Sequence, residues 1–287
     1  MKYRILTGSH GFIGTRYRDR FKESDNLAYK MIYIDRKNGI DLASPNNMSL
    51  VLNTIGSSER GVPSSVINMA AITQVQDGLD MPGNCLYNNT ILVLGLCEFC
   101  RMNNIKLIHF STDKVYGEND AAKETDPLNA EYPYDVSKKI GEEIIQTYVK
   151  NYGLKALIVR PCNVYGDNDP NKDRLIPLIL DAKETGKRVT LRTDGRGRRD
   201  YIHVDDLLDA LDLLIEKDAT GIYNISSGEN YSAVEVLDMA GVDYEVGESE
   251  SEIKVQHIHS DKLRELDWEP KHNLKDFLNK RHEHESV

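Results

Sequence analysis

A tyrosine and a lysine four residues apart, Tyr134 and Lys138, are the pair in this sequence best suited to acid–base chemistry. Positions i and i+4 of a helix share one face, so the two side chains can meet. A tyrosine with an ordinary pKa of about 10 is a poor base at neutral pH. An ammonium one turn away would stabilise the phenolate and lower that pKa. Such a pair could take a proton from an alcohol. The alternative is an exposed aromatic residue beside a helical lysine.

Three glycines near the start of the chain, Gly8, Gly11 and Gly14, are spaced GxxGxxG between an expected strand and an expected helix. Gly8 would permit the tight turn, Gly11 would let the backbone approach a diphosphate, and Gly14 would let helix and strand pack closely. The helix N-terminus then presents free N–H groups to the phosphates. Glycines at such a turn can serve geometry alone, but together with the tyrosine–lysine pair they predict a dinucleotide site.

Asp35 ends the second expected strand, where a carboxylate can accept hydrogen bonds from both ribose hydroxyls of a dinucleotide. The same charge would repel a 2′-phosphate, so the sequence favours NAD over NADP. Arg36 follows directly and could bind that phosphate, which keeps NADP as the alternative. Asp35 could also be a simple turn residue. Asp41 and Leu42 lie at a distance suited to the adenine rim.

Short apolar runs alternate with amphipathic helical stretches through the first half of the chain. Strands are expected at 4–7, 31–34, 65–69, 106–110 and 156–159, and helices at 13–23, 84–102 and 134–152. Apolar strands of this kind are buried on both faces, and helices between them act as crossovers. The pattern therefore predicts an α/β fold with a doubly wound parallel sheet, whose ligands bind at the carboxyl ends of the strands.

The pattern loosens after Pro161, where a helix is expected at 204–217 and a strand at 222–225. Two parts are expected from this change. The NAD-binding domain would comprise residues 1–165 together with about 200–225, and a smaller C-terminal substrate-binding lobe would comprise 166–199 and 226–287.

The bulk composition excludes several classes of protein. The 287 residues carry a formal net charge of −10, which argues against a nucleic-acid surface. No signal peptide and no apolar run of membrane length is found, so a cytoplasmic protein is expected. Cys97 and Cys100 form a CxxC without a second ligand pair, so they are expected to be core thiols, and no metal site is expected. His282 and His284 are expected in a frayed end.

Seven motifs occur in an order that resembles the extended short-chain dehydrogenase/reductases, a Rossmann-fold family that epimerises, dehydrates or decarboxylates nucleotide sugars. The motifs are Gly8 to Gly14, Asp35, Asn68 to Ala71, Ser111 to Gly117, Tyr134 to Lys138, Arg160 to Gly166 and Arg199 to Val204. The resemblance implies that NAD is held by Gly8, His10, Gly11, Phe12, Ile13, Gly14, Asp35, Arg36, Asp41, Leu42, Met69, Ala70, Ala71, Tyr134 and Lys138. Lys138 would hold the nicotinamide ribose as well as assist Tyr134.

The residues after the fourth strand bear on the reaction. Thr112 resembles the family's Ser/Thr that hydrogen-bonds the C4 oxygen of the sugar, although it could also be a helix or turn cap. C4-epimerases of the family usually place small or neutral residues next, whereas Asp113 and Lys114 resemble the pairs of 4,6-dehydratases. Asp113 would be the acid at C6, and Lys114 the base at C5 if burial depresses its pKa. The alternative is an ordinary charge pair on a surface loop.

The substrate would be a nucleotide-diphosphate sugar. Asn163 and Arg199 resemble the family's diphosphate contacts, and Arg174 is a second candidate arginine. Arg196 and Arg198 add to a basic cluster in an acidic protein. The leading function is NAD-dependent 4,6-dehydration through a 4-keto sugar. C4-epimerisation or decarboxylation is the alternative, and a non-catalytic NAD-binding sensor is a second. A homodimer through the helices at 84–102 and 134–152 is expected.

Overall fold

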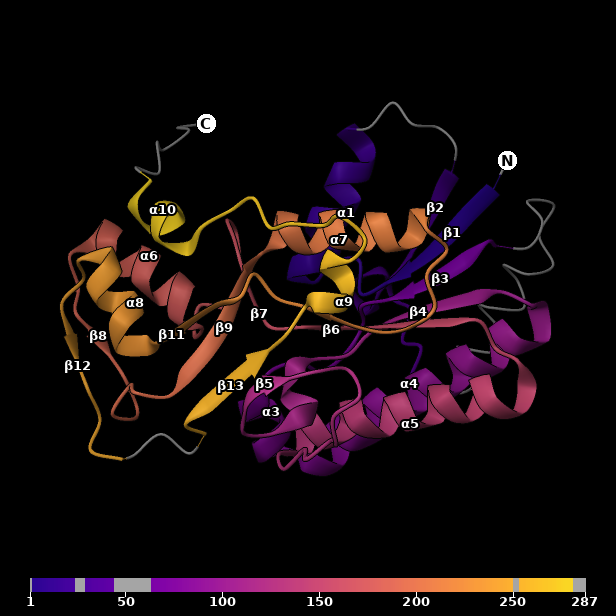
Figure 1. The fold of residues 1–287 in the computed structure, drawn as a ribbon, viewed down its shortest axis with the longest axis horizontal. Coiled ribbons are helices and arrows are strands. Elements are labelled where there is room, and N and C mark those ends of the chain that lie inside the picture. The colour runs from indigo at the N-terminus through magenta and orange to yellow at the C-terminus, as the bar shows by residue number, and fades with distance from the viewer. Residues whose placement is uncertain (1, 24–28, 44–62, 250–252, 281–287) are drawn as a thin grey trace. The chain divides into compact units, whose positions relative to one another are not determined.

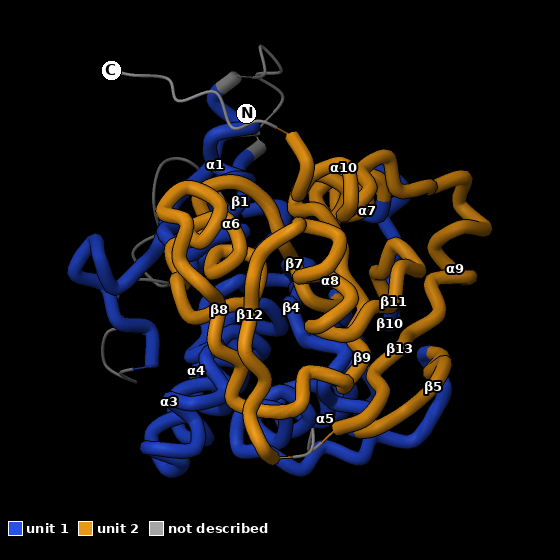
Figure 2. The backbone as a smooth tube through the Cα atoms, turned by 90° about the vertical axis from the view of Figure 1, so that its left-hand side faces the viewer, with its two compact units in different colours: residues 1–117, 124–161, 214–223 blue, residues 118–123, 162–213, 224–287 orange. Residues whose placement is uncertain are grey.

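The computed structural model describes residues 2–23, 29–43, 63–249 and 253–280. The chain forms two compact units, shown in blue and orange in Figure 2. Unit 1 comprises residues 1–117, 124–161 and 214–223, and unit 2 comprises residues 118–123, 162–213 and 224–287. Each unit has a sheet and a hydrophobic core of its own.

A six-stranded sheet with the order β10-β6-β4-β3-β1-β2 is the centre of unit 1 (Figure 1). Strand β1 pairs in parallel with β2 and β3, and β4 pairs in parallel with β3 and β6. Its strands are β1 (Lys2–Thr7), β2 (Tyr29–Ile34), β3 (Ser65–Asn68), β4 (Lys106–Phe110), β6 (Ala156–Pro161) and β10 (Gly221–Ile225). Every residue of β3, β4 and β6 is buried. The doubly wound parallel sheet predicted from the apolar runs is confirmed.

Helices α4 (Pro82–Asn103) and α5 (Pro133–Tyr152) run side by side along this sheet (Figure 1). Each has a proline in its first turn, where the missing N–H is no loss. The C-cap residues that follow them, Asn104 and Gly153, both have the left-handed backbone conformation. Apolar side chains of both helices and of β3, β4 and β6 form one core. Two further helices of unit 1 are α1 (Phe12–Glu23) and α3 (Val75–Asp80).

The CxxC cysteines lie inside this core. Cys97 and Cys100 are both fully buried free thiols, as the sequence predicts. Burial raises the pKa of Cys97 to about 12, with the nearby carboxylate of Glu98 adding to the rise. A thiol with so high a pKa is protonated at neutral pH and is a poor nucleophile or metal ligand.

Unit 2 is built on a mixed five-stranded sheet of order β11-β9-β13-β5, with β7 also paired to β9 (Figure 2). Its strands are β5 (Asn119–Ala122), β7 (Asn163–Tyr165), β9 (Arg198–His203), β11 (Glu229–Ser232) and β13 (Val255–Ile258). A second, two-stranded sheet joins β8 (Val189–Thr190) and β12 (Tyr244–Glu245). The helices are α6 (Leu175–Thr185), α8 (Ala233–Ala240), α9 (Asp261–Arg264) and α10 (Leu274–Asn279), and α7 (Val204–Glu216) continues into unit 1. Apolar residues of α6, α8 and α10 form the core.

The boundaries between the two units differ from those expected from the sequence. Residues 162–165 and 200–213 belong to unit 2, because β7 pairs with β9 and β9 lies inside the second sheet. Residues 118–123 also belong to unit 2, because β5 pairs with β13, more than a hundred residues later. Such long-range pairings leave no local signal in the sequence. The assignment of NAD to one part and substrate to the other stays a prediction.

Two sequence expectations concern the margins of the chain. The tail with His282 and His284 lies outside the described residues. Within the ranges that the structure describes, no helix has both the length and the apolar composition needed to cross a membrane.

Candidate active site

The glycine turn joins β1 to α1 and is tightly constrained. Gly8 has φ +71°, and a Cβ there would lie 2.6 Å from the backbone nitrogen of Ala70. A Cβ on Gly14 would lie 2.1 Å from the carbonyl oxygen of Gly8. Neither position can hold a side chain without moving the backbone. Gly11 is exposed and donates its N–H to Gly8 O at 3.1 Å. The turn therefore presents bare backbone at the N-terminus of α1, which fits a diphosphate.

Asp35 is a turn residue as well as a candidate ribose ligand. It caps the short 3-10 helix η1 (Arg36–Asn38), accepting a hydrogen bond from Lys37 N at 2.9 Å. It also accepts one from His10 N at 3.0 Å, which ties the glycine turn to the end of β2. Its side chain is 13% exposed. Contact with a ribose stays a prediction.

Arg36 is held by other side chains of unit 1. Its Nη2 donates to Asn88 Oδ1 at 2.7 Å, and its Nε lies 3.1 Å from Asp41 Oδ1. An arginine paired with a carboxylate has less charge to offer a 2′-phosphate, which favours NAD. Leu42, beside Asp41, is buried.

Met69, Ala70 and Ala71 follow β3 and lie against the glycine turn. The backbone N–H of Met69 donates to Thr7 O at 3.2 Å, and that of Ala70 to Thr7 Oγ1 at 3.4 Å. Because β1 and β3 are parallel neighbours, their carboxyl ends bring residues 8–14 and 69–71 to one edge of the sheet. This is the edge at which the sequence predicted the dinucleotide.

Tyr134 and Lys138 lie in the first two turns of α5 and are 7% and 4% exposed. Lys138 Nζ donates to the carbonyl oxygen of Phe110 at 2.7 Å. Burial lowers the pKa of Lys138 to about 8, and the carboxylate of Glu142 opposes this shift. A lysine with this pKa is still mostly an ammonium at neutral pH, so it can support a phenolate. The role of Tyr134 as the base stays a prediction.

Helix α4 positions the turn that carries this pair. Asn89 Nδ2 donates to Ser137 Oγ at 2.8 Å, and the Ser137 hydroxyl donates to Tyr134 O at 2.6 Å. The same Asn89 side chain accepts from Ile72 N and donates to Ile72 O. The amide therefore joins the loop after β3 to the start of α5. Nothing in the sequence motifs singled out Asn89.

Thr112 and Asp113 begin the 3-10 helix η2 (Asp113–Tyr116) directly after β4. Thr112 caps η2 by accepting from Lys114 N at 3.3 Å, and its hydroxyl donates to Asp113 Oδ1 at 3.0 Å. Asp113 is 1% exposed, so the surface-loop interpretation is wrong for this residue. Lys114 Nζ lies 3.9 Å from Asp113 Oδ1 and is partly exposed. Thr112, Asp113 and Lys114 thus form one hydrogen-bonded and charged group.

A buried ion pair supports this region, and sequence reasoning gave it no role. Arg160 at the end of β6 donates from Nε to Glu142 Oε1 at 2.9 Å, and from Nη1 to the hydroxyl of Tyr116. The hydroxyl of Ser111 donates to the same carboxylate. Glu142 and Arg160 are 0% and 1% exposed. The pair joins α5 to the carboxyl ends of β4 and β6. The sequence held one sign of this pair: Glu142 follows Lys138 by one helical turn and therefore lies on the same face of α5.

The expected diphosphate residues all lie in unit 2. Asn163 Nδ2 donates to Asp200 O at 3.1 Å, and Arg199 Nη1 donates to Ile253 O at 3.0 Å. Arg174 precedes α6 and pairs with Asp169 at 3.2 Å, with 40% of its side chain exposed. Each side chain is held within unit 2, and their contact with a diphosphate stays a prediction.

In the basic cluster around Arg199, fewer arginines are available to a ligand than the sequence implied. Arg198 Nη1 lies 2.8 Å from Glu235 Oε2, and Arg198 Nε donates to Asn230 Oδ1 at 3.0 Å. Its charge is therefore used to hold α8 to β9.

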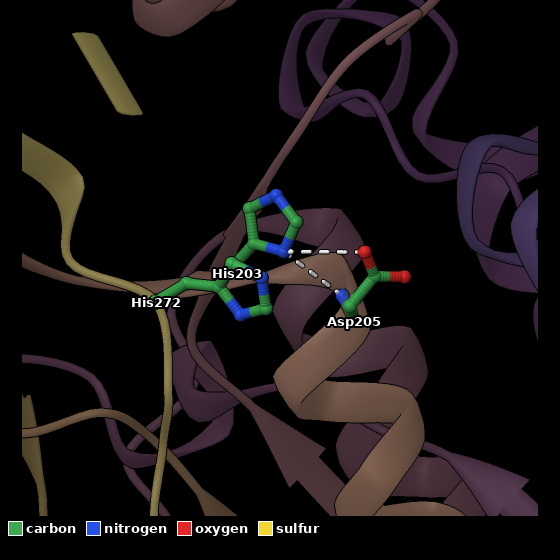
Figure 3. A group of neighbouring side chains, drawn as sticks. All are labelled: His203, Asp205 and His272. Carbon is green, nitrogen blue, oxygen red and sulfur yellow. Dashed lines mark hydrogen bonds and ion pairs between the residues drawn. The ribbon is translucent and has the colours of Figure 1, made fainter. Parts of the chain in front are cut away.

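Three side chains of unit 2, His203, Asp205 and His272, place ligand atoms within 4.8 Å of one another (Figure 3). His203 Nδ1 accepts from the N–H of Asp205, and the two imidazoles stack with centroids 4.1 Å apart and an 18° interplanar angle. Lone pairs lie in the ring planes, so stacked rings cannot aim at one ion. Buried Asp206 holds His272 Nδ1 at 2.8 Å. The group ties the start of α7 to the segment before α10.

The relatives of this chain include two kinds of sugar enzyme. A dTDP-glucose 4,6-dehydratase of Mycobacterium tuberculosis is 28% identical, over 93% of this chain and 88% of the relative. A dTDP-D-glucose 4,6-dehydratase of Dictyostelium discoideum is also 28% identical over 81% of this chain, which matches only 60% of that longer protein. A putative UDP-glucose 4-epimerase of Methanocaldococcus jannaschii is 28% identical, over 96% of this chain and 95% of the relative.

Two solved structures of similar shape carry the same two activities. A UDP-glucose 4-epimerase of Thermotoga maritima, solved with UDP-glucose, has a TM-score of 0.83 at 26% identity, covering 96% of both chains. A dTDP-glucose 4,6-dehydratase of Bacillus anthracis, solved with NAD, has a TM-score of 0.82 at 26% identity, covering 97% of this chain and 94% of the other.

The family model described as the NAD dependent epimerase/dehydratase family matches residues 5–226 of this chain. That range contains the glycine turn, Thr112, Tyr134 and Lys138. NAD is the cofactor of the family, and the glycine turn fits it. The protein therefore belongs to the NAD-dependent epimerases and dehydratases that act on nucleotide sugars.

Proposed function

We propose that this enzyme carries out the 4,6-dehydration of a nucleotide-activated hexose. The observation that carries this proposal is the buried carboxyl of Asp113, hydrogen-bonded to Thr112 at 3.0 Å and 3.9 Å from the amine of Lys114. C4-epimerisation needs a base at O4 and a hydride acceptor. It needs no further acid, whereas dehydration needs an acid at C6 and a base at C5. A carboxyl kept out of water beside the candidate C4 hydroxyl ligand supplies that additional group.

The residues divide the reaction between them. Tyr134 takes the proton of the C4 hydroxyl, while Thr112 holds that oxygen and Lys138 supports the phenolate. NAD supplies the hydride acceptor for C4 and the hydride donor for C6. Once C4 is a ketone, the C5 proton is acidic and Lys114 removes it. Asp113 protonates the C6 hydroxyl, which leaves as water, and Lys114 returns the proton to C5 when C6 has been reduced.

The relatives support either a dehydratase or an epimerase, so the alternative is C4-epimerisation. A panel of UDP-, dTDP-, CDP- and GDP-hexoses tests the choice by the alkaline absorbance of 4-keto sugars and by chromatography of the sugar product. A 4-keto-6-deoxy product supports the proposal. A C4-epimer without ketone accumulation overturns it in favour of the epimerase. Bound NAD without turnover of any sugar would instead support the sensor.

We further propose that unit 1 binds NAD, and that Asn163, Arg174 and Arg199 of unit 2 bind the diphosphate of the substrate. The two arginines favour an anionic ligand in a protein of net charge −10. A guanidinium donates two parallel hydrogen bonds to a phosphate. The four buried free thiols are consistent with a reducing compartment, and we place the enzyme in the cytoplasm.

We propose a homodimer formed through α4 and α5. Most of the large apolar side chains that are exposed in the described residues lie on these two helices. Those on α4 are Tyr87, Leu94 and Met102, at 55%, 40% and 69% exposure, and those on α5 are Val149 and Tyr152, at 43% and 60%. Apolar side chains gathered on one pair of helices favour burial against a second copy.

A further inference from the structure

Asp135 is a buried carboxyl that the mechanism above does not use. It directly follows Tyr134 in the first turn of α5, three residues after the N-cap Tyr132, and it is 2% exposed. The backbone N–H of Tyr132 donates a hydrogen bond to its carboxylate. Among the described residues, its Oδ1 has no hydrogen-bond partner. A carboxylate that only caps a helix usually faces water. This one keeps an unsatisfied oxygen inside the protein, which costs stability unless the group has another role.

Two of the charged groups around Asp135 belong to the proposed active site. Lys114 and Asp113 act on it from η2, and Glu131 acts on it from the loop before α5. Asp135 in turn acts on the buried thiol of Cys85 in α4. Burial raises the pKa of Asp135 to about 7; Lys114 opposes this rise and Asp113 adds to it. At neutral pH the carboxyl is therefore protonated about half of the time.

The proposed dehydration leaves the enzyme one proton out of place after each turnover. Tyr134 has gained the proton of the C4 hydroxyl, and Asp113 has given its proton to the oxygen that leaves as water. Lys114 has taken one proton from C5 and returned it there. The next turnover therefore needs Tyr134 to lose a proton and Asp113 to regain one.

We propose that Asp135 supplies the proton that returns Asp113 to its acid form. This rests on the proposed dehydratase function. In this step the O–H bond of Asp135 breaks and an O–H bond forms on Asp113, with no change of oxidation state. Asp135 is reprotonated by the Tyr134 hydroxyl or by solvent. Because Asp135 acts through Asp113 and not on the sugar, its effect falls on the second and later turnovers.

The Asp135→Asn variant tests the proton supply. The amide keeps the shape of the side chain and an oxygen for the N–H of Tyr132, but it cannot supply this proton. With enzyme in excess over substrate, the first turnover should proceed at the wild-type rate. In the steady state, kcat should fall about tenfold or more with KM unchanged, and Asp135→Glu should restore part of it. The decline of wild-type kcat above about pH 7 should be absent from the Asn variant.

Glu143→Gln is the matched control, because it removes an exposed carboxylate of the same helix that is not among the charges acting on Asp135; it should leave kcat and its pH profile unchanged. Equal slowing of single and multiple turnovers in Asp135→Asn would show a structural role and overturn the proposal, as would an unchanged kcat. A readout without substrate is ¹³C NMR of labelled aspartates: one carboxyl should titrate near neutral pH and vanish in Asp135→Asn. Its absence from the wild type also overturns the proposal. Failure of every nucleotide sugar to react overturns the dehydratase function instead.

Discussion

The amine of Lys138 donates a hydrogen bond to the carbonyl oxygen of Phe110 at 2.7 Å, joining the second turn of α5 to the last residue of β4. The ammonium is thereby held out of water, and this burial lowers its pKa. Its support of a Tyr134 phenolate stays a prediction.

The buried Lys138 should make stability depend on pH in a defined window. Its folded pKa of about 8 lies below the ordinary 10.5. Between these values the unfolded chain holds a proton that the folded chain has lost, so the free energy of unfolding rises with pH. Relative to Lys138→Met, the wild type should gain about 3 kcal/mol across this window. Urea unfolding of both proteins at several pH values measures the difference. Lys150→Met, on an exposed position of α5, should track the wild type; a constant difference for Lys138→Met would contradict the prediction.

Asp113→Asn should separate oxidation at C4 from loss of water. The amide can still accept from Thr112, but it cannot protonate the C6 hydroxyl. Formation of 4-keto-6-deoxy sugar should fall by about 100-fold or more, whereas NADH should still appear when enzyme and sugar are mixed. Near-ultraviolet absorbance follows NADH, and alkaline absorbance follows the product. An unchanged product rate would show that Asp113 is not the acid.

Removing one partner of the Glu142–Arg160 pair should destabilise the fold more than replacing both partners together. Glu142→Leu or Arg160→Met leaves one buried charge without its partner, which should lower the free energy of unfolding by about 3–5 kcal/mol. Glu142→Leu with Arg160→Met removes both charges and should be less destabilising than the sum of the single changes. Urea unfolding of the four proteins completes the cycle. Additive losses would indicate that the two charges do not interact.

Gly14→Ala should abolish NAD binding, because its Cβ would lie 2.1 Å from the backbone oxygen of Gly8. The turn must open, and its N–H groups then no longer converge on the diphosphate. Gly83→Ala is the matched control, since a Cβ there meets nothing within 4 Å and alanine favours the helix by about 1 kcal/mol. Calorimetric titration with NAD compares the two. Tight binding by Gly14→Ala would refute the steric role.

If the dimer forms through α4 and α5, a charge introduced on the exposed apolar face of these helices should separate the two copies. Leu94→Glu places a carboxylate in the centre of α4, where burial against a partner would be unfavourable. Light scattering coupled to size-exclusion chromatography should give the mass of one chain, against two for the wild type. Leu79→Glu, at an exposed site on α3, should remain dimeric. A wild type of one chain would exclude the dimer outright.

Local patterns account for much of what could be predicted. Apolar runs without polar alternation identified β1 to β4 and β6, because burial on both faces of a parallel sheet leaves that signature. Helix ends were less accurate: α4 begins at Pro82 rather than at Asn84. Tyr134 and Lys138 could be placed on one face of a helix from their spacing alone, because four residues make about one helical turn.

Burial and long-range pairing could not be read from the chain. Asp113 and Asp135 are ordinary acids in the sequence, and both are buried in the region where η2 packs on α5. Arg198 belongs to a basic cluster in the sequence, but its guanidinium pairs with Glu235, which is distant in the chain.

The sequence by itself determined the order of strands and helices in the first half of the chain, the glycine turn and the spacing of Tyr134 and Lys138, because these depend on neighbours within a few residues. Only the tertiary structure decided which charges are buried, which arginines are already paired and where β5 joins the second sheet. Those properties depend on residues brought together from opposite ends of the chain, and the energy of a charge is set by everything packed around it.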